Sequence, residues 1–287
     1  MTEYPTAIGT SDATSISLLG HDLATELMGQ VSFGELAFWL VALRRPEPGE
    51  LRLFEAVLVA LADHGFTPSA IAARLTLTGA PESVQGALAA GLLGGGSRYL
   101  GVTEDCGRFL ADALAAAAGD DTAATDSAAA TDSADGTPGT AGTGLPADDD
   151  EAAWDELAAR AVRARRAAGL LVPGLGHPVH KDGDPRTPVI FAIAGEAGVL
   201  GPHLRLFAAV GRVHPAILNR ALPLNGAGVC GAALADLGFP PDMLRGFALL
   251  ARAAGLLGHL AEEMRRPAGP GIYRQADESV RYQPPSA

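Results

Sequence analysis

The residues best suited to chemistry lie in the stretch 169–188, which reads GLLVPGLGHPVHKDGDPRTP. This stretch holds His177, His180 and Arg186, together with the only lysine of the chain, Lys181. Glycines and prolines interrupt its apolar residues, so we expect a tight loop instead of a continuing helix. An imidazole titrates near neutral pH and a guanidinium stays charged, so the loop suits a small anion such as a carboxylate.

Two further charged or titratable residues are associated with predicted helices. His64 follows a helix expected over 50–63, where apolar residues recur at steps of three and four. There it could satisfy free carbonyl groups or bind a ligand, and the residues alone do not decide between these roles. Arg252 interrupts an apolar helix expected over 243–266. A buried guanidinium needs a carboxylate, supplied either by the protein or by a ligand.

A metal site is a weaker alternative for the central loop. His177 and His180, with Asp182 or Asp184, offer metal-binding groups, which would suit a metal hydrolase. An HxxH pair around a proline has no defined helical face, however. We therefore expect no metal.

The central loop also carries a family resemblance. GLGHPVHKDGDPR is similar to the glycine, histidine, lysine and DPR signature of citrate synthases and of the related citryl-CoA lyase modules. Other segments resemble further parts of that family and occur in the same order along the chain. They are ADHGFTPSAIAARLT, GAPESVQGALAAGLLGGGSRYLG, LPLNGAGVCGAALADLGFP, FALLARAAGLLGHLAEE and IYR. The resemblance covers most of the chain except the segment 117–152.

The resemblance implies a site that holds an oxaloacetate or citrate unit. In the family, histidines and arginines bind this unit, while one histidine and an aspartate act on the acetyl thioester. The residues that match the oxaloacetate side are His64, His177, Arg186, Arg252 and Arg274. The resemblance further implies a homodimer, in which Arg274 serves the neighbouring subunit.

The thioester side departs from the family pattern. Gly94 stands where citrate synthases have a histidine, and Ala227 in NGAG stands where they have the catalytic aspartate. Neither residue can transfer a proton. Condensation needs a base that deprotonates a weakly acidic methyl group, whereas cleavage asks less of the protein.

For cleavage, we expect His177 to take the proton of the citryl hydroxyl. The glycines after residue 93 form either a plain turn or a loop whose N–H groups approach the coenzyme A thioester. In the second case, an oxyanion hole would be formed by the backbone of Gly94, Gly95, Gly96 and Ser97.

The predicted function is therefore that of a citryl-CoA lyase-like enzyme, which cleaves citryl-CoA to acetyl-CoA and oxaloacetate. The first alternative is a citrate or methylcitrate synthase. The second is a non-catalytic relative that binds a dicarboxylate or coenzyme A, an interpretation that Gly94 and Ala227 favour. We expect no bound cofactor, because coenzyme A enters as the substrate thioester.

Composition predicts an all-α fold. Of the 287 residues, 48% are hydrophobic but only 5% are aromatic, so Ala, Leu and Val must form the core, which favours closely packed helices. The resemblance implies citrate synthase-like large and small helical domains, without part of the usual N-terminal region. The large domain would comprise residues 1–96 and 241–287, and the small domain residues 97–240.

Two segments of low complexity stand outside the predicted helices. Residues 1–20 are rich in Ser and Thr, and we expect them to be extended or poorly ordered. Ala, Asp, Thr, Gly, Ser and Pro make up nearly all of the segment at about 117–152. Such a composition cannot form a core, so it predicts a disordered acidic insertion on the surface.

Charge and targeting signals limit the expected partners to small molecules. The net charge of −12 argues against nucleic acid and anionic membranes, which need clustered positive charge. The sequence has no apolar run of about 18 residues and no signal-peptide pattern, so we expect a cytoplasmic protein. Cys106 and Cys230 give no disulfide framework.

Overall fold

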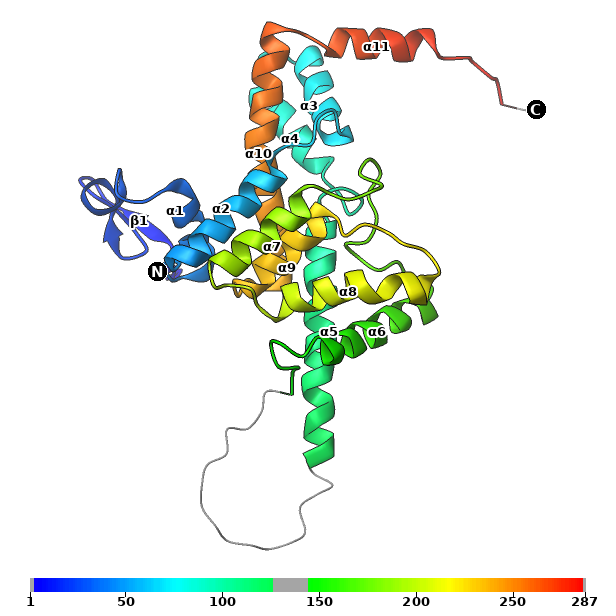
Figure 1. The fold of residues 1–287 in the computed structure, drawn as a ribbon. Helices are drawn as coiled ribbons and strands as arrows, with labels where there is room; N and C mark the ends of the chain where they lie inside the picture. The colour runs from blue at the N-terminus through cyan, green and yellow to red at the C-terminus, as the bar shows by residue number, and fades with distance from the viewer. Residues whose placement is uncertain (1–2, 126–143, 286–287) are drawn as a thin grey trace, which may run out of the picture.

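The computed structural model describes residues 3–125 and 144–285, and helices form most of the secondary structure of this part (Figure 1). The helices are α1 (Phe33–Ala42), α2 (Pro48–Ala62), α3 (Pro68–Gly79), α4 (Val84–Leu93), α5 (Val102–Thr125), α6 (Glu151–Ala167), α7 (Arg186–Glu196), α8 (Pro202–Leu218), α9 (Gly226–Asp236), α10 (Pro241–Arg265) and α11 (Gly269–Glu278). They confirm the predicted all-α fold and the helices expected from apolar periodicity. Within the described ranges, no helix is long and apolar enough to cross a membrane.

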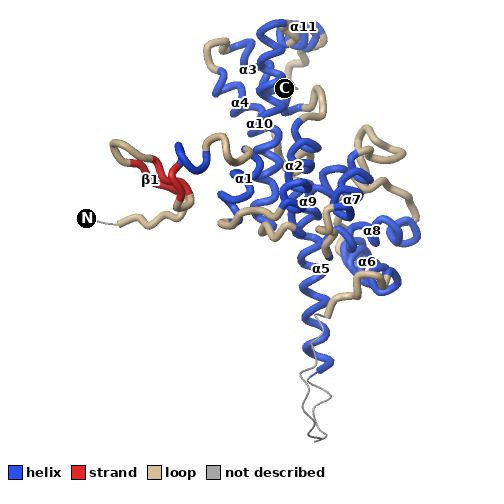
Figure 2. Tube along the Cα trace, turned by 60° about the vertical axis from the view of Figure 1, so that its left-hand side comes forward, coloured by secondary structure: helices blue, strands red, loops and turns tan. Residues whose placement is uncertain are grey.

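The N-terminal residues form a small antiparallel sheet that projects from the helices (Figure 2). Its strands are β1 (Gly9–Ser11), β2 (Ile16–Leu18) and β3 (His21–Asp22), and a short π-helix, η1 (Leu23–Leu27), follows. Gly9 pairs with Leu18, and Leu18 pairs with His21. The expectation of an extended chain is met, but the strands are too short to show a periodic pattern in the sequence.

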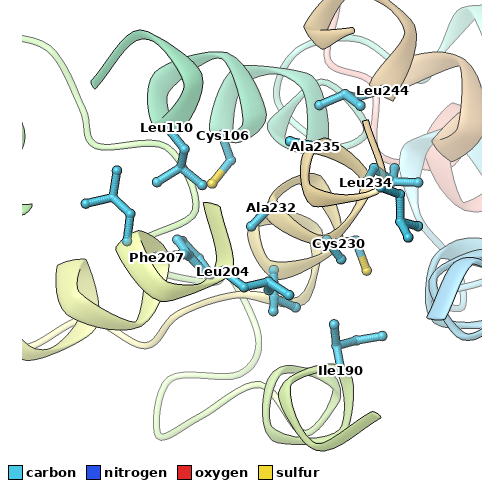
Figure 3. Close-up of a cluster of buried hydrophobic side chains, with 14 of the residues drawn as sticks. Cys106, Leu110, Ile190, Leu204, Phe207, Cys230, Ala232, Leu234, Ala235 and Leu244 are labelled. Atoms are coloured by element: carbon cyan, nitrogen blue, oxygen red, sulfur yellow. The ribbon is translucent and has the colours of Figure 1, made fainter. Parts of the chain in front are cut away.

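Two apolar clusters hold the helices together. The larger cluster joins α1 and α2 to α5–α9 and to the first half of α10, and Figure 3 shows part of it around Cys106, Phe207 and Cys230. The smaller cluster joins α3 and α4 to the second half of α10, through Leu256 and Leu260. Helix α10 therefore passes through both clusters. The domain boundaries expected from the sequence stay a prediction.

Helix α9 lies at the centre of the larger cluster because its residues are small. Gly226, Gly228 and Gly231 are buried, as are nearly all the apolar residues between and after them. A Cβ at Gly231 would collide with the backbone carbonyl of Thr103 at the start of α5. The glycine thus permits close packing of α5 on α9, an arrangement that leaves α9 rigidly held beside the central loop.

The predicted acidic insertion is shorter than expected at its beginning. Helix α5 continues through residue 117 to Thr125, so the first part of the segment 117–152 is helical. Alanine has the highest helix propensity, and its abundance there extends the helix despite the lack of core residues. Residues 126–143 lie outside the described residues. At the other end, Trp154 on α6 donates its indole N–H to the carbonyl of Ala147.

Candidate active site

The central loop is fixed against the segment before α9. Gly174 and Gly176 have φ angles of +84° and +81°, which favour glycine. The N–H of Gly176 donates to the carbonyl of Pro223 at 2.7 Å, and the Asn225 side chain donates to the carbonyl of Gly176 at 2.8 Å. The N–H of Asn225 in turn donates to Gly174 at 2.9 Å. The loop before His177 is therefore held on both sides, which sets the direction of the imidazole.

Three imidazoles meet between this loop and the end of α2. His64 lies between α2 and α3, and its Nε2 is 3.2 Å from the Nε2 of His180. The ring centroids are 4.4 Å apart for His177 and His180 and 5.1 Å apart for His64 and His177. The structure thus brings together His64 and His177, which the sequence predicted to share a site. It adds His180, which was considered only as a metal ligand.

The hydrogen bonds of His177 determine which ring nitrogen carries the proton. Its Nδ1 accepts the backbone N–H of Val179 at 3.1 Å and that of His180 at 2.9 Å. Both partners are donors, so the neutral ring carries its proton on Nε2. Burial, together with the nearby His180, lowers the pKa of His177 to about 4. His177 therefore presents an N–H group to the site, an arrangement that favours donation; its expected role as the base that accepts the hydroxyl proton stays a prediction.

The three histidines could be taken for a metal centre by distance alone. Their ligand atoms all lie within 4.8 Å of one another. His177 does not fit such a centre, because its only free ring nitrogen carries a proton and the other accepts two backbone N–H groups. The buried carboxylate of Asp184 is already paired with Arg186. The residues present therefore do not fit a three-histidine metal site.

Arg186 lies at the start of α7 and is held by Asp184. Its Nε and Nη2 donate to the two carboxylate oxygens of Asp184 at 2.9 and 2.7 Å, and its Nη1 donates to the carbonyl of Ala60 at 3.2 Å. Burial opposes ionisation of Asp184. The hydrogen bonds from Arg186 and from the N–H of Gly226 outweigh burial and hold the pKa of this carboxyl well below its usual range. The ion pair therefore persists at neutral pH.

Arg252 on α10 is the most unusual charged residue of the site. It is only 5% exposed, yet no carboxylate within the described residues lies at ion-pair distance from it. Its contacts are long: Nη1 is 3.4 Å from Thr67 Oγ1, and Nη2 is 3.3 Å from the carbonyl of Leu61. Its Nε has no hydrogen-bond partner among the described residues. Burial lowers the pKa of this guanidinium, as does the nearby Arg186, while Asp63 opposes them.

A second buried arginine, in contrast, forms ion pairs with carboxylates of the protein. Arg74 on α3 is 1% exposed and forms ion pairs with Glu262 and Glu263. Its Nε also donates to Nδ1 of His259 at 3.1 Å, and His259 Nε2 contacts Asp63 Oδ1 at 2.9 Å. This network supports the loop that carries His64. His259 lies two turns after Arg252 on α10, and its partners come from α3 and from the end of α2.

A cavity of about 460 Å³ opens beside His177. Lys181 and Arg220 line it together with apolar residues that include Leu222. The two cations give the cavity a positive charge beside the neutral imidazole. It therefore suits a ligand that is anionic along part of its length.

The amino-acid sequence that builds this site matches a known protein family. Residues 13–276 match the model of the citrate synthase C-terminal domain. The chain belongs to the citrate synthase family. No curated protein matches it in sequence.

Solved structures of this family support a lyase-like architecture. The chain is similar to citryl-CoA lyase from Hydrogenobacter thermophilus, with a TM-score of 0.77, 26% identity, and coverage of 99% of this chain and 96% of that one. It also resembles ATP citrate lyase from Methanothrix soehngenii in complex with citrate and coenzyme A, with a TM-score of 0.70, 21% identity, and coverage of 100% of this chain and 42% of that one. For citrate synthase from Thermotoga maritima, the TM-score is 0.60 at 15% identity, over 89% of this chain and 57% of that one.

In the glycine-rich turn of this citrate synthase family member, two of the four N–H groups expected to form an oxyanion hole are bonded within the chain. The N–H of Gly94 donates to Ala90 at 3.1 Å, and that of Gly95 donates to Leu92 at 2.9 Å. These bonds end α4, where the last carbonyl groups need donors. The N–H groups of Gly94 and Gly95 are therefore not free for a ligand in this structure, and the oxyanion hole as a whole stays a prediction. Gly96 and Ser97 follow in the same turn and are exposed, whereas Gly95 is buried.

The other positions singled out by the family pattern lie apart from one another. Arg274 is exposed on α11, at the end of the molecule farthest from α6 and α8 (Figure 1). Ala227 lies in the first turn of α9, next to Gly226, whose N–H donates to Asp184 at 2.7 Å. Within one chain of this citrate synthase family member, His64, His177, Arg186 and Arg252 therefore gather, and Arg274 does not.

Proposed function

We propose that the chain is a citryl-CoA lyase-like enzyme, which cleaves citryl-CoA to acetyl-CoA and oxaloacetate. The observation that carries this proposal is Arg252, a buried guanidinium without a protein carboxylate. A buried charge without a partner costs several kcal/mol, roughly, so a ligand carboxylate is the natural partner. Similarity to a citryl-CoA lyase over nearly the whole chain supports the same conclusion.

The proposed substrate pose follows from the charges of the site. One carboxylate of the citryl unit binds Arg252, and a second binds the exposed edge of Arg186, whose other edge is occupied by Asp184. The Nε2–H of His177 donates to the oxygen of the tertiary hydroxyl. This donor stabilises the negative charge on that oxygen once the hydroxyl proton has left and before the carbon–carbon bond breaks. Cleavage then yields the carbonyl of oxaloacetate and the enolate of acetyl-CoA.

The thioester arm extends into the cavity beside His177. Lys181 and Arg220 provide positive charge for the phosphate groups of coenzyme A. The cavity begins at the imidazole, so the citryl carbon and the coenzyme A chain can be bound at the same time. No bound cofactor is needed, because coenzyme A is part of the substrate.

Two other functions remain as alternatives: one requires a catalytic base, and the other requires no catalytic residue. A citrate or methylcitrate synthase must deprotonate a methyl group, and neither Gly94 nor Ala227 can do so. A non-catalytic relative would need only the arginines. Gly94, Ala227 and the occupied N–H groups of the glycine-rich turn favour this second alternative.

We propose that Arg274 completes the site of a partner subunit in a homodimer. It is exposed on α11, away from the histidines of its own chain. A guanidinium on a projecting helix can reach an anionic ligand in a second copy. The resemblance to the family supports this role.

The decisive experiment supplies citryl-CoA and follows oxaloacetate through malate dehydrogenase and NADH. Cleavage is expected, and Arg252→Gln should lower kcat/KM about 10- to 100-fold because a charged hydrogen bond is lost. Arg265→Gln changes an exposed arginine on the same helix and serves as the matched control. Absence of cleavage with retained citrate binding in calorimetry would support the non-catalytic relative. Absence of both would contradict the proposed ligand class.

A further inference from the structure

His180 lies at the centre of the site without a role in the function described so far. Its Nε2 is 3.2 Å from the Nε2 of His64, and its ring lies 4.4 Å from that of His177. The two Nε2 atoms can form a hydrogen bond only if one of them carries a proton and the other offers its lone pair. The ring that donates through its Nε2–H keeps a free lone pair on Nδ1, and the other ring carries its proton on Nδ1. The His64–His180 pair therefore offers one proton acceptor.

His177 cannot supply the acceptor that cleavage requires. Its Nδ1 already accepts two backbone N–H groups, and its Nε2 carries the proton of the neutral ring. Asp184 cannot supply it either, because its oxygens accept from Arg186 and from the N–H of Gly226. The hydroxyl proton must leave, however, before the carbon–carbon bond can break. The shared pair is the acceptor that remains among the described residues of the cluster.

We propose that His180 and His64 form a proton-accepting pair that takes the hydroxyl proton of the substrate, while His177 acts only as a hydrogen-bond donor. This inference rests on the proposed cleavage of citryl-CoA. It assigns to His180 a role that neither the sequence pattern nor the family resemblance indicated. His180 receives the proton, and its hydrogen bond to His64 spreads the resulting charge over both rings.

The proposed step conserves atoms and electrons. The hydroxyl proton moves to the free lone pair of the His64–His180 pair, and the oxygen electrons form the carbonyl of oxaloacetate. The electrons of the broken carbon–carbon bond form the enolate of acetyl-CoA. The enolate carbon then takes up one proton, and the pair gives one back to solvent. No net proton is consumed, and no oxidant or reductant is needed.

The charges that face the pair come from each element around it. Asp63 precedes His64 at the end of α2, and Asp184 and Arg186 lie where the central loop enters α7. Arg252 faces the same region from α10, and Lys181 follows His180 in the loop. Asp184 is paired with Arg186, and Asp63 is hydrogen-bonded to His259. A substrate carboxylate at Arg252 would add a negative charge that favours the protonated pair.

The test compares His180→Gln with the unmodified protein across pH 5 to 9, in buffer with EDTA to remove any adventitious metal. We expect kcat for citryl-CoA cleavage to fall about 10²- to 10⁴-fold, as is typical for loss of a general base. The acid limb of the pH profile should disappear, while KM changes little because the arginines remain. His203→Gln, at a histidine paired with Asp236 on another face, is the control and should retain activity.

A spectroscopic measurement keeps this test independent of turnover. Long-range nitrogen–proton NMR of the histidine-labelled protein should show the Nε2–H form of His177. It should also show a coupling through the hydrogen bond between Nε2 of His64 and Nε2 of His180, which is lost in His180→Gln. If the unmodified protein does not cleave citryl-CoA, the proposed function fails and the NMR alone decides the pairing. A kcat for His180→Gln within threefold of the unmodified protein, or the absence of that coupling in the unmodified protein, would overturn the proposal.

Discussion

Asp184 holds Arg186 through two hydrogen bonds, from Nε to Oδ1 at 2.9 Å and from Nη2 to Oδ2 at 2.7 Å. Both residues are close enough to His177 to influence its ionisation, and the carboxylate also receives the N–H of Gly226 at the start of α9. One carboxylate thus fixes the orientation of a substrate-binding arginine and joins it to the central helix of the core.

Asp184→Asn should destabilise the protein by about 3 kcal/mol at pH 7, because the variant leaves Arg186 without its counter-charge. The folded-state pKa of Asp184 lies below that of an unfolded aspartate. Its contribution is therefore present above pH ~4 and is lost as the pH falls further. Urea unfolding at pH 7 and pH 3 measures both effects. Asp182→Asn, at an exposed neighbour, should leave stability unchanged.

Arg252→Met should raise the melting temperature of the free protein while removing the stabilisation that citrate provides. The substitution removes a buried charge that lacks a carboxylate and keeps an apolar chain of similar length. Arg74→Met is the matched control. Arg74 is equally buried but paired with Glu262 and Glu263, so its loss should destabilise the free protein. A lower melting temperature for both variants would show that Arg252 is a structural cation.

The ionisation of His177 should make the free energy of unfolding depend on pH. Burial and the nearby His180 lower its folded-state pKa to about 4, below the unfolded value of 6.5. The unfolded chain therefore binds a proton first, and stability falls as the pH drops from about 6.5 to about 4. In His177→Asn this part of the pH dependence should vanish, because asparagine does not titrate. The loop should keep its structure, since the amide oxygen can still accept the two loop N–H groups. Parallel denaturation curves for both proteins in that window would contradict the assignment.

Gly95→Ala should lower stability by about 1–3 kcal/mol with little effect on turnover per folded molecule. An added Cβ would lie 2.5 Å from Leu100 Cδ1 and 3.0 Å from the carbonyl of Leu92. Gly96→Ala is the control, because nothing lies within 4 Å of its Cβ. Turnover is measured at a temperature where both variants are folded. A selective loss of turnover in Gly95→Ala would restore a catalytic role for the turn.

The sequence predicted the parts of the site that depend on local pattern and order. His177 and Arg186 were evident from the loop motif, and Arg252 from its place in an apolar helix. Their convergence with His64 follows from the family fold. The pairing of His64 with His180 joins residues 116 positions apart, and no local spacing encodes it.

Other features could not be predicted from the sequence, because they depend on which backbone N–H groups are hydrogen-bonded in the folded chain. The N–H groups of Gly94 and Gly95 are consumed by the last carbonyl groups of α4. The tautomer of His177 depends on two loop N–H groups whose direction only the folded chain fixes. The helical start of the acidic segment reflects alanine propensity, which competed with a composition typical of disorder.

The position of Arg252 along α10 connects substrate binding to the stability of the whole molecule. Ala251 before it packs in the larger apolar cluster, and Leu256 after it packs in the smaller one. A carboxylate bound at Arg252 therefore lies where the larger and the smaller apolar cluster meet on helix α10. Ligand occupancy and the cooperativity of unfolding are thermodynamically linked there, so a melting curve reports binding even when no turnover occurs.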